Sequence, residues 1–441
     1  MASTVRRSLL KASFSVLFLT SCVMEQPYRS VLTEANGFEL EKMFAREPGA
    51  YETKVWLLPD GGYVTMCSVR PAGEPYDAVR IVRIDKEGGE CWTSTLQRRV
   101  GCDLCPTRDG GCVVAAMTYA AWRHRGSTWI PLRVTLTKID DQGRETWSRV
   151  ISADSHWKFV SVHQSADGGY SVAGWVLEQE TLTPGRNVGD YVYRMCLVKT
   201  DEHGETIWSR SFREKEATGI SVRQTADGGY AVLGRSFSRS DGSDEEDETI
   251  SVVRPDAVYV VRTDASGHEI WSRSLGGEGA ESSWAFLLTE DGDLVLVGGI
   301  ESYGSAGRDV YAVALDADGA VKWSRRYSGE GDQEGCSVAT TLDGGYVIAG
   351  YTDGGNAGTL YPLVIKVDRH GNAVWARVVH ASGRNAGLSV MQTNDGGYTL
   401  LCADCGVRGV TFGYMGYYDL WLDTWTQRAP RRFALYRLAH E

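Results

Sequence analysis

The chain has 441 residues, a formal net charge of −11 and 42% hydrophobic residues. The negative charge excludes a general electrostatic attraction to nucleic acid or to an anionic membrane surface, and the apolar content is sufficient to bury a core. The chain also has 51 Gly, 21 Tyr and 14 Trp, a composition that favours many short strands joined by tight turns.

The N-terminus has the features of an export signal. A basic start with Arg6, Arg7 and Lys11 precedes the apolar stretch 12–19, which is too short to span a bilayer. The stretch ends in Leu19-Thr20-Ser21-Cys22. We therefore expect residues 1–21 to be a removed signal peptide; the alternative is an ordinary secretory signal with a chance cysteine.

The sequence around Cys22 resembles the lipobox of bacterial lipoproteins. The resemblance implies that Cys22 is acylated, for example with palmitate, and becomes the new N-terminus. Fatty acyl chains on one residue anchor a protein stably without a transmembrane helix. Residues 22–36 are then a lipidated tether that places the protein at a membrane, outside the cytoplasm. Val23 follows the cysteine, which favours the outer membrane if the organism is diderm.

Residues 37–441 contain two alternating signatures. The first is Asp-Gly-Gly-Tyr or a close variant, and Asp-Gly between two β-rich runs predicts a hairpin with a primed turn. It begins at Asp60, Asp109, Asp167, Asp227, Asp291, Asp343 and Asp395. The second is Asp, two residues, Gly, three residues and Trp, which predicts another hairpin. Its tryptophans are Trp92, Trp147, Trp208, Trp271, Trp323 and Trp375, which we expect to pack between repeats as structural residues.

Each repeat predicts four strands. We name them A, before the first signature, B, after it, C, which ends at the second Asp, and D, which carries the Trp. Four-stranded units of about 50 residues are typical of β-propeller blades. The first signature occurs seven times and the second six times, so the last unit lacks a D strand, and residues 38–44 supply the spare one. The prediction is an all-β, seven-bladed β-propeller in which the N-terminal strand completes the last blade.

The spacing of Asp, Gly and Trp resembles the repeat of pyrroloquinoline-quinone-type propellers, over residues 38–438. Those repeats usually have one more residue between Asp and Gly. A lipid-anchored propeller of this type is also distantly similar to the propeller lipoprotein of the outer-membrane assembly machinery, which has eight blades. The resemblance implies a propeller without implying the quinone, because seven blades and the lack of adjacent cysteine pairs argue against that cofactor. We expect no cofactor.

Nearly all variation in repeat length falls in the B–C loops, which open on one face of a propeller together with the D–A connections. Variable loops on a rigid scaffold are common binding sites, and aromatic residues and Arg are common anchors of protein interfaces. The predicted partner-binding residues are Trp122, Trp129, Phe412, Tyr414, Tyr417, Tyr418, Trp421, Trp425 and Arg428. The alternative is that these aromatic side chains pack on one another as a local core.

Metal sites and disulfides are weakly indicated. The blade 4 loop is acidic between Asp241 and Glu248, but its spacing fits no 12-residue calcium loop. Cys102 and Cys105 form one CxxC pair and Cys402 and Cys405 another, and zinc would require them to meet across an intervening blade. We expect no metal. Ten cysteines in an exported chain suggest some disulfides.

The sequence shows no nucleophile motif and no acid pair that can be placed in space. The leading hypothesis is a non-enzymatic cell-envelope lipoprotein that acts as a binding or scaffold module through its B–C loop face, with a protein or glycan partner and no nucleic acid. The alternative is an envelope hydrolase or lyase that acts on carbohydrate or peptide with a pocket at the mouth of the propeller channel. A deep pocket with two or three convergent carboxylates or a histidine with a perturbed pKa would favour the enzyme, whereas an apolar, aromatic-rimmed flat patch would favour binding.

Overall fold

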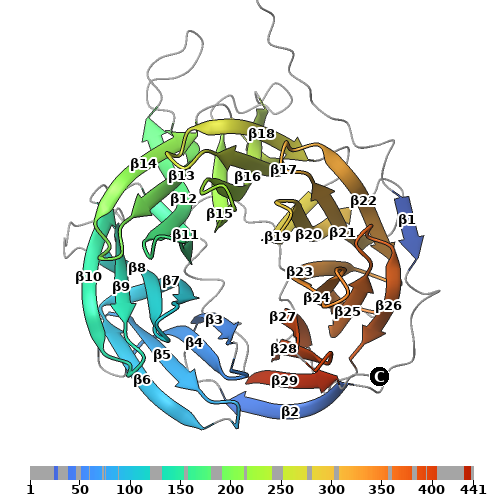
Figure 1. The fold of residues 1–441 in the computed structure, drawn as a ribbon, viewed down its shortest axis with the longest axis horizontal. Helices are drawn as coiled ribbons and strands as arrows, with labels where there is room; N and C mark the ends of the chain where they lie inside the picture. The colour runs from blue at the N-terminus through green and yellow to red at the C-terminus, as the bar shows by residue number, and fades with distance from the viewer. Residues whose placement is uncertain are drawn as a thin grey trace, which may run out of the picture.

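The computed structural model shows an all-β chain. It describes residues 24–27 and 38–45, and residues 51–438 with gaps at 59, 72–73, 75, 88, 120–131, 153–156, 180–190, 213–215, 241–251, 276–280, 302–306, 356–359, 380–384, 394 and 405–431. Over these residues the strands form one five-stranded sheet and six four-stranded sheets. The sheets are arranged radially around a central axis, which is the architecture of a β-propeller (Figure 1). No helix able to cross a membrane occurs in the part of the chain that is described.

Each sheet follows the predicted A–B–C–D order, and we number the sheets as blades. Blade 1 has β3 (Tyr51–Leu57), β4 (Tyr63–Val69), β5 (Ala78–Ile84) and β6 (Glu90–Gln97). Blade 2 has β7 (Arg99–Pro106), β8 (Cys112–Tyr119), β9 (Leu132–Ile139) and β10 (Glu145–Ser152). Blade 3 has β11 (Trp157–Gln164), β12 (Tyr170–Gln179), β13 (Tyr191–Thr200) and β14 (Thr206–Phe212). Blade 4 has β15 (Ala217–Gln224), β16 (Tyr230–Ser240), β17 (Val252–Thr263) and β18 (Glu269–Leu275).

The remaining blades involve both ends of the chain. Blade 5 has β19 (Glu281–Leu288), β20 (Leu294–Glu301), β21 (Arg308–Leu315) and β22 (Val321–Ser328), and blade 6 has β23 (Gln333–Thr340), β24 (Tyr346–Thr352), β25 (Tyr361–Val367) and β26 (Ala373–Val378). Blade 7 has β27 (Asn385–Gln392), β28 (Tyr398–Asp404) and β29 (Arg432–Leu438), and its fourth strand is β2 (Phe38–Ala45). β2 pairs antiparallel with β29, from Phe38 opposite Leu438 to Ala45 opposite Arg432.

A short strand lies outside blade 5. β1 (Met24–Pro27) pairs in parallel with β22, with Met24 opposite Arg325 and Pro27 opposite Ser328. It lies within the segment that the sequence predicts to be a tether, and it covers part of an outer blade edge (Figure 1). Such a cover reduces the exposure of unpaired backbone groups that could recruit another strand.

The hairpin turns are not the predicted primed turns. In blade 6, the Gly344 N–H donates to the Thr341 carbonyl at 2.9 Å and the Thr341 N–H donates to the Gly345 carbonyl at 3.0 Å. Gly344 has φ of +78°, whereas among the described non-glycine residues only Arg98 has positive φ. This pattern is a three-residue loop in which a type I turn is followed by a left-handed glycine. The prediction of a hairpin and of its glycine was right, but the primed turn type was wrong.

The aspartate of the first signature organises this turn. The Asp343 carboxylate accepts hydrogen bonds from Thr341 Oγ1 at 2.5 Å, the Gly345 N–H at 3.1 Å and Lys366 Nζ at 3.0 Å. Burial alone would raise the pKa of Asp343, but these donors outweigh it and lower the pKa to about 2. The same Asp–cation pairing occurs in four other blades, as Arg83–Asp60, Lys138–Asp109, Lys199–Asp167 and Arg262–Asp227. The repeated aspartates are therefore structural.

Candidate functional site

The tryptophans of the second signature lie at the contacts between neighbouring blades. The Trp323 ring of blade 5 faces Gly371 in the C–D turn of blade 6, where an added Cβ would lie only 2.7 Å from it. Trp323 Nε1 donates to the Arg369 carbonyl of the same turn at 3.0 Å. Trp92, Trp147, Trp208 and Trp271 face the equivalent glycines of the next blade, at 143, 204, 267 and 319. Only Trp323 among the six is fully buried, and the others are half-buried.

The two sequence signatures meet at these contacts. The ring centroid of Trp147 lies 5.7 Å from that of Tyr170, which belongs to the Asp-Gly-Gly-Tyr of the following blade. The equivalent distances are 5.6 Å for Trp208–Tyr230, 6.1 Å for Trp323–Tyr346 and 5.4 Å for Trp375–Tyr398. Trp208–Tyr230 and Trp375–Tyr398 meet edge-on, the other two pairs are tilted, and aromatic pairs at these distances stabilise packing beyond their buried area. Each signature therefore supplies one half of a blade-to-blade contact.

The residues predicted to bind a partner lie outside the described part of the chain. Trp122 and Trp129 fall in the gap 120–131, and Phe412, Tyr414, Tyr417, Tyr418, Trp421, Trp425 and Arg428 fall in the gap 405–431. Cys22 also lies outside the described residues. The strands that lead into both gaps end on the B–C loop face, so both sequences connect to that face of the ring.

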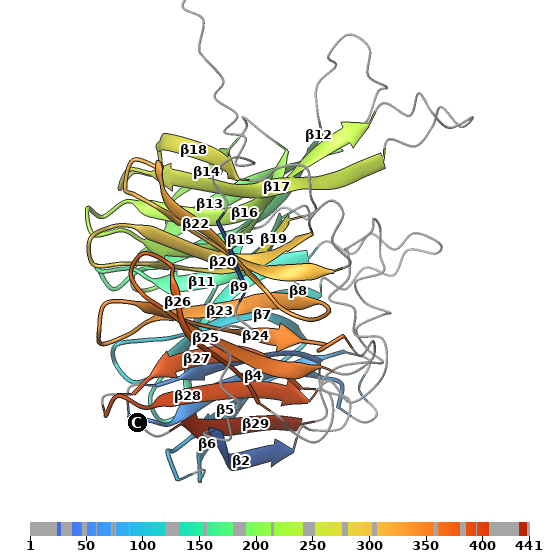
Figure 2. The same ribbon diagram turned by 90° about the vertical axis from the view of Figure 1, so that its right-hand side faces the viewer.

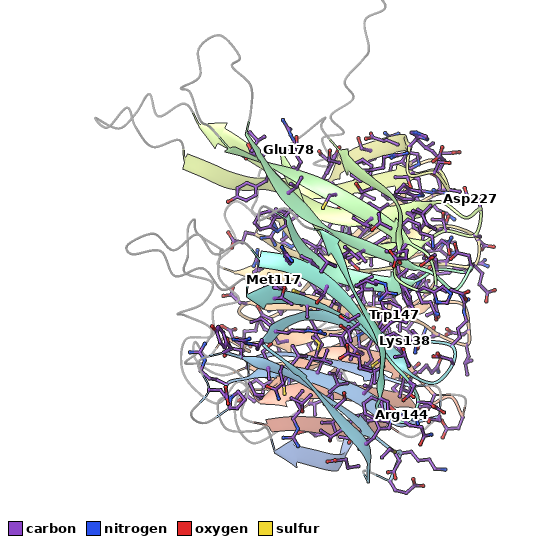
Figure 3. The ribbon with its side chains drawn as sticks, turned by 90° about the vertical axis from the view of Figure 1, so that its left-hand side faces the viewer. Met117, Lys138, Arg144, Trp147, Glu178 and Asp227 are labelled. Atoms are coloured by element: carbon purple, nitrogen blue, oxygen red, sulfur yellow. The ribbon has the colours of Figure 1, made fainter. Side chains whose placement is uncertain are left out.

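Blades 3 and 4 extend farthest on the B–C loop face. Their B and C strands have 10 to 12 residues, compared with 7 or 8 in the other blades. β12 and β17 project beyond the ring (Figure 2). Figure 3 shows Glu178 near the tip of this projection and Asp227 and Arg144 on the opposite face, which carries the A–B and C–D turns. We call the projecting parts of β12, β13, β16 and β17 the ridge.

An aromatic pair lies at the base of the ridge. The rings of Trp175 on β12 and Tyr193 on β13 meet edge-on, with centroids 5.0 Å apart. Both side chains remain half-buried. Partly exposed Trp and Tyr on a rigid strand pair lose little conformational entropy when a partner covers them. This pair is a candidate contact that the sequence analysis did not select, because it lies inside strands.

Ion pairs stiffen the loop face in blades 1 and 5. The buried Asp77 accepts hydrogen bonds from Nε and Nη2 of Arg70 at 2.7 and 3.0 Å. In blade 5, the buried Asp309 accepts a hydrogen bond from Arg326 Nε at 2.6 Å. Such pairs hold the first residues of the C strands in place beneath the loops. The loop face therefore rests on fixed strand ends.

A second group of side chains comes from the innermost strands, near the axis of the ring. The innermost strands contribute Trp56 from β3, Asp103 and Cys105 from β7, His163 from β11, Arg223 from β15 and Phe286 from β19, and we call these six residues the axial cluster. The guanidinium of Arg223 lies 5.9 Å from the ring centroids of both Trp56 and Phe286. Since β3 and β15 belong to blades 1 and 4, which lie across the ring from each other (Figure 1), Arg223 reaches over the axis.

Burial shifts the titration of these axial groups. It lowers the pKa of Arg223, with Cys105 and Asp103 opposing the shift. Burial also raises the pKa of Asp103, against the positive charge of Lys54 and the hydrogen bond from the Val162 N–H at 2.9 Å. The pKa of His163 falls to about 3, because burial and then the charges of Arg223 and Arg108 disfavour the imidazolium. His163 is therefore neutral at physiological pH.

The axial cluster is not arranged as a thiol nucleophile, although it contains Cys, His and Asp. Burial raises the pKa of Cys105 to about 11, and the Cys105 thiol donates to the Pro106 carbonyl at 3.2 Å. A reactive cysteine needs a lowered pKa and a base in hydrogen-bond contact. No hydrogen bond joins Cys105 and His163 in the described structure. The axis therefore holds the Arg223 cation beside a protonated Cys105 thiol and a neutral His163.

His163 gives a prediction for stability against pH. Its folded pKa of about 3 lies below the ordinary value of 6.5, so between these values the unfolded chain binds a proton that the folded chain does not. Stability therefore falls as pH falls through 6.5, by about 1–2 kcal/mol between pH 7 and pH 5 from this residue. Urea unfolding at both pH values should show a smaller difference for His163→Gln than for the parent. An unchanged difference would contradict the assignment.

The sequence analysis missed the axial cluster, although the repeat contained a signal. Aligned on the residue just before the end of each A strand, the seven positions are Trp56, Cys105, His163, Arg223, Leu287, Ala339 and Met391. Arg223 is the one charged residue in this set. A charge at an innermost position of a propeller strand is unusual, since the other members of the set are apolar or neutral.

The described residues bear on the metal sites and disulfides that the cysteines suggest. They contain no group of three or more His, Cys, Asp or Glu side chains that could hold a metal ion. Cys102 lies on β7 and Cys402 on β28, while Cys405 falls outside the description. Cys91, Cys105, Cys112 and Cys196 are free thiols.

Comparisons with known proteins support the propeller fold. Residues 196–403, somewhat less than half of the chain, match the family described as outer membrane protein assembly factor BamB. The WD40 domain of Pan2 from Neurospora crassa superimposes with a TM-score of 0.53 at 9% identity, covering 93% of this chain and 98% of that domain. No curated protein gave a significant match.

Two further solved structures are less similar. A protein of unknown function from Dyadobacter fermentans has a TM-score of 0.45 at 11% identity, covering 92% of this chain and 100% of that one. A puromycin hydrolase has a TM-score of 0.48 at 13% identity, and the match covers 85% of this chain but 53% of the hydrolase. At these identities the similarity of the Pan2 domain concerns the fold alone. The chain is a β-propeller with repeats similar to those of the matched assembly-factor family.

Proposed function

We propose that the protein is a non-enzymatic lipoprotein of the cell envelope that binds a partner through the B–C loop face of a seven-bladed propeller closed by β2. The ridge carries this proposal, since it raises two neighbouring blades above the ring on the face where the loops vary in length. The match of residues 196–403 to an outer membrane assembly factor adds support for a scaffold that binds protein in the envelope. The hydrolase or lyase alternative rests on the lowered pKa of His163, but the axial cluster contains only one carboxyl group, that of Asp103, and the Cys105 thiol is held protonated.

The partner-binding part of this proposal predicts separate effects on stability and capture. Replacing Trp421 and Trp425 with alanine should change the free energy of unfolding by no more than ~0.5 kcal/mol if they contact a partner. Capture of the partner after cross-linking in the native envelope should fall, since such anchors contribute ~2 kcal/mol or more. Trp175→Ala, at the base of the ridge, should act in the same direction.

The control for the capture experiment is Trp208→Ala. Trp208 faces Gly267 at a blade contact, so its replacement should lower the thermal midpoint while the remaining folded protein binds normally. If the loop variant melts as low as this control, Trp421 and Trp425 belong to a local core. Normal capture by a stable loop variant would also contradict the proposal.

Lipid anchoring predicts a separate result. Cys22→Ala removes the thiol that would be acylated, and the protein should move from the detergent phase to the aqueous phase in Triton X-114 partitioning. Cys91→Ala changes an exposed thiol of the propeller body and should leave partitioning unchanged. A Cys22→Ala protein that still enters the detergent phase would rule out the anchor.

A further inference from the structure

The guanidinium of Arg223 has an unused hydrogen-bonding edge. Its Nη1 atom donates to the Val222 carbonyl at 2.8 Å and to Ser221 Oγ at 3.4 Å. Nε and Nη2 have no hydrogen-bond partner among the described residues. These two nitrogens form one of the parallel N–H forks through which arginine binds a carboxylate in bidentate fashion.

Arg223 also lacks a neutralising partner. Among the described residues no carboxylate lies within ion-pair distance of it. The carboxyl group of Asp103 influences its charge electrostatically, but an oxygen of Asp103 accepts the Val162 N–H of the next blade. A charged guanidinium that is partly removed from water and unpaired costs free energy, unless an anion compensates it.

The unused edge is accessible to solvent. Arg223 is half-buried. Its Nε and Nη2 atoms have no partner among the described residues, but neither atom is completely buried. Arg223 is the second-last residue of β15, so it lies near the turn face of the ring, opposite the ridge. A small solute could therefore reach the guanidinium without disturbing the B–C loops.

The neighbours of this edge favour an apolar ligand body. The half-buried ring of Trp56 lies beside the guanidinium, whereas the Phe286 ring, at the same distance, is buried in the core. The corresponding A-strand positions of blades 5, 6 and 7 are Leu287, Ala339 and Met391. His163 is neutral at physiological pH and so does not repel or attract an anion by charge.

We propose that the axial cluster binds a small monocarboxylate with an apolar body, whose carboxylate pairs with Nε and Nη2 of Arg223. The ligand body would lie against the half-buried ring of Trp56. This site is on the turn face and is independent of partner binding through the loop face. It gives a second binding role to a face that the repeat otherwise uses for structural turns.

Calorimetry with benzoate tests the proposal on the full mature chain. Benzoate should bind saturably, whereas benzamide, with the same ring and no charge, should bind at least tenfold more weakly. Inorganic phosphate, which is charged but has no apolar body, should also bind at least tenfold more weakly. Equal affinities for benzoate and either comparison compound would overturn the proposal, as would no binding of benzoate.

Variants then locate the site. Arg223→Lys keeps the positive charge but removes the planar fork, and should weaken benzoate binding at least tenfold. Arg210→Lys is the matched control, because Arg210 lies over the Trp208 ring on the outer strand β14; it should bind benzoate like the parent. Unchanged binding by a folded Arg223→Lys variant would overturn the assignment.

A measurement on the parent covers the case in which Arg223 variants fail to fold. His163 is the histidine of the axial cluster. Its ring proton NMR signals can be assigned by comparison with His163→Gln, and they should shift when benzoate is added. The other His signals, from the remaining seven of the eight histidines, should not shift. A benzoate titration that leaves the His163 signals in place would place the ligand elsewhere and overturn the proposal.

Discussion

Replacing Trp323 with alanine should lower the free energy of unfolding by about 3–5 kcal/mol, because it removes a buried aromatic side chain between two blades. Trp323 is 8% exposed, packs against Tyr346 and donates a hydrogen bond to the Arg369 carbonyl. The residual cavity cannot close by local movement, since the strands on its two sides are held in separate sheets. Urea unfolding followed by tryptophan fluorescence and circular dichroism would measure the change.

Two further variants test the physical reason. Trp323→Phe keeps most of the ring and removes the indole N–H. It should therefore lower the free energy of unfolding by only about 1 kcal/mol beyond the loss of one hydrogen bond to a solvent-exposed turn. Trp271→Ala removes an equivalent but half-buried ring and should cost less than Trp323→Ala. A Trp323→Ala protein that unfolds at the same urea concentration as the parent would show that the blade contact contributes little.

The repeat signatures predicted most of the fold because they mark local chemistry. Glycine at a left-handed turn position, aspartate that accepts turn N–H groups and tryptophan at a fixed distance from the turn are all visible along the chain. Residues 38–44, which the sequence predicts to be the spare strand, lie in β2 (Phe38–Ala45), which pairs with β29. The turn type was wrong because Asp-Gly occurs both in two-residue primed turns and in three-residue loops with a left-handed glycine.

The axial cluster could not be derived in the same way. Arg223 meets Trp56 across the ring, a contact between strands of different blades that depends on how far the innermost strands approach the axis. Sequence position shows that both residues precede a turn, but not that their side chains meet. Likewise, the pairing of β1 with β22 joins residues about 300 positions apart and has no repeat signature to indicate it. Contacts of this kind are set by the ring geometry rather than by local propensity.

The second large effect should come from removing β2. Deleting residues 23–45 would leave β29 of blade 7 without its outer neighbour, whereas the parent pairs them from Phe38–Leu438 to Ala45–Arg432. An exposed strand edge can pair with another molecule, and the ring would lose the contact that joins its two ends. We expect a thermal midpoint at least ~5 °C lower, together with aggregation that increases with protein concentration.

The matched control is deletion of residues 23–36, which keeps Cys22 and β2 but removes β1. β1 pairs with β22 over only four residues and adds a fifth strand to a sheet that already has its four. This variant should therefore elute like the parent in size-exclusion chromatography, with a thermal midpoint close to that of the parent. The two deletions differ only in whether β2 and the residues just before it are removed. Equal midpoints and equal solubility would therefore show that β2 does not close the ring.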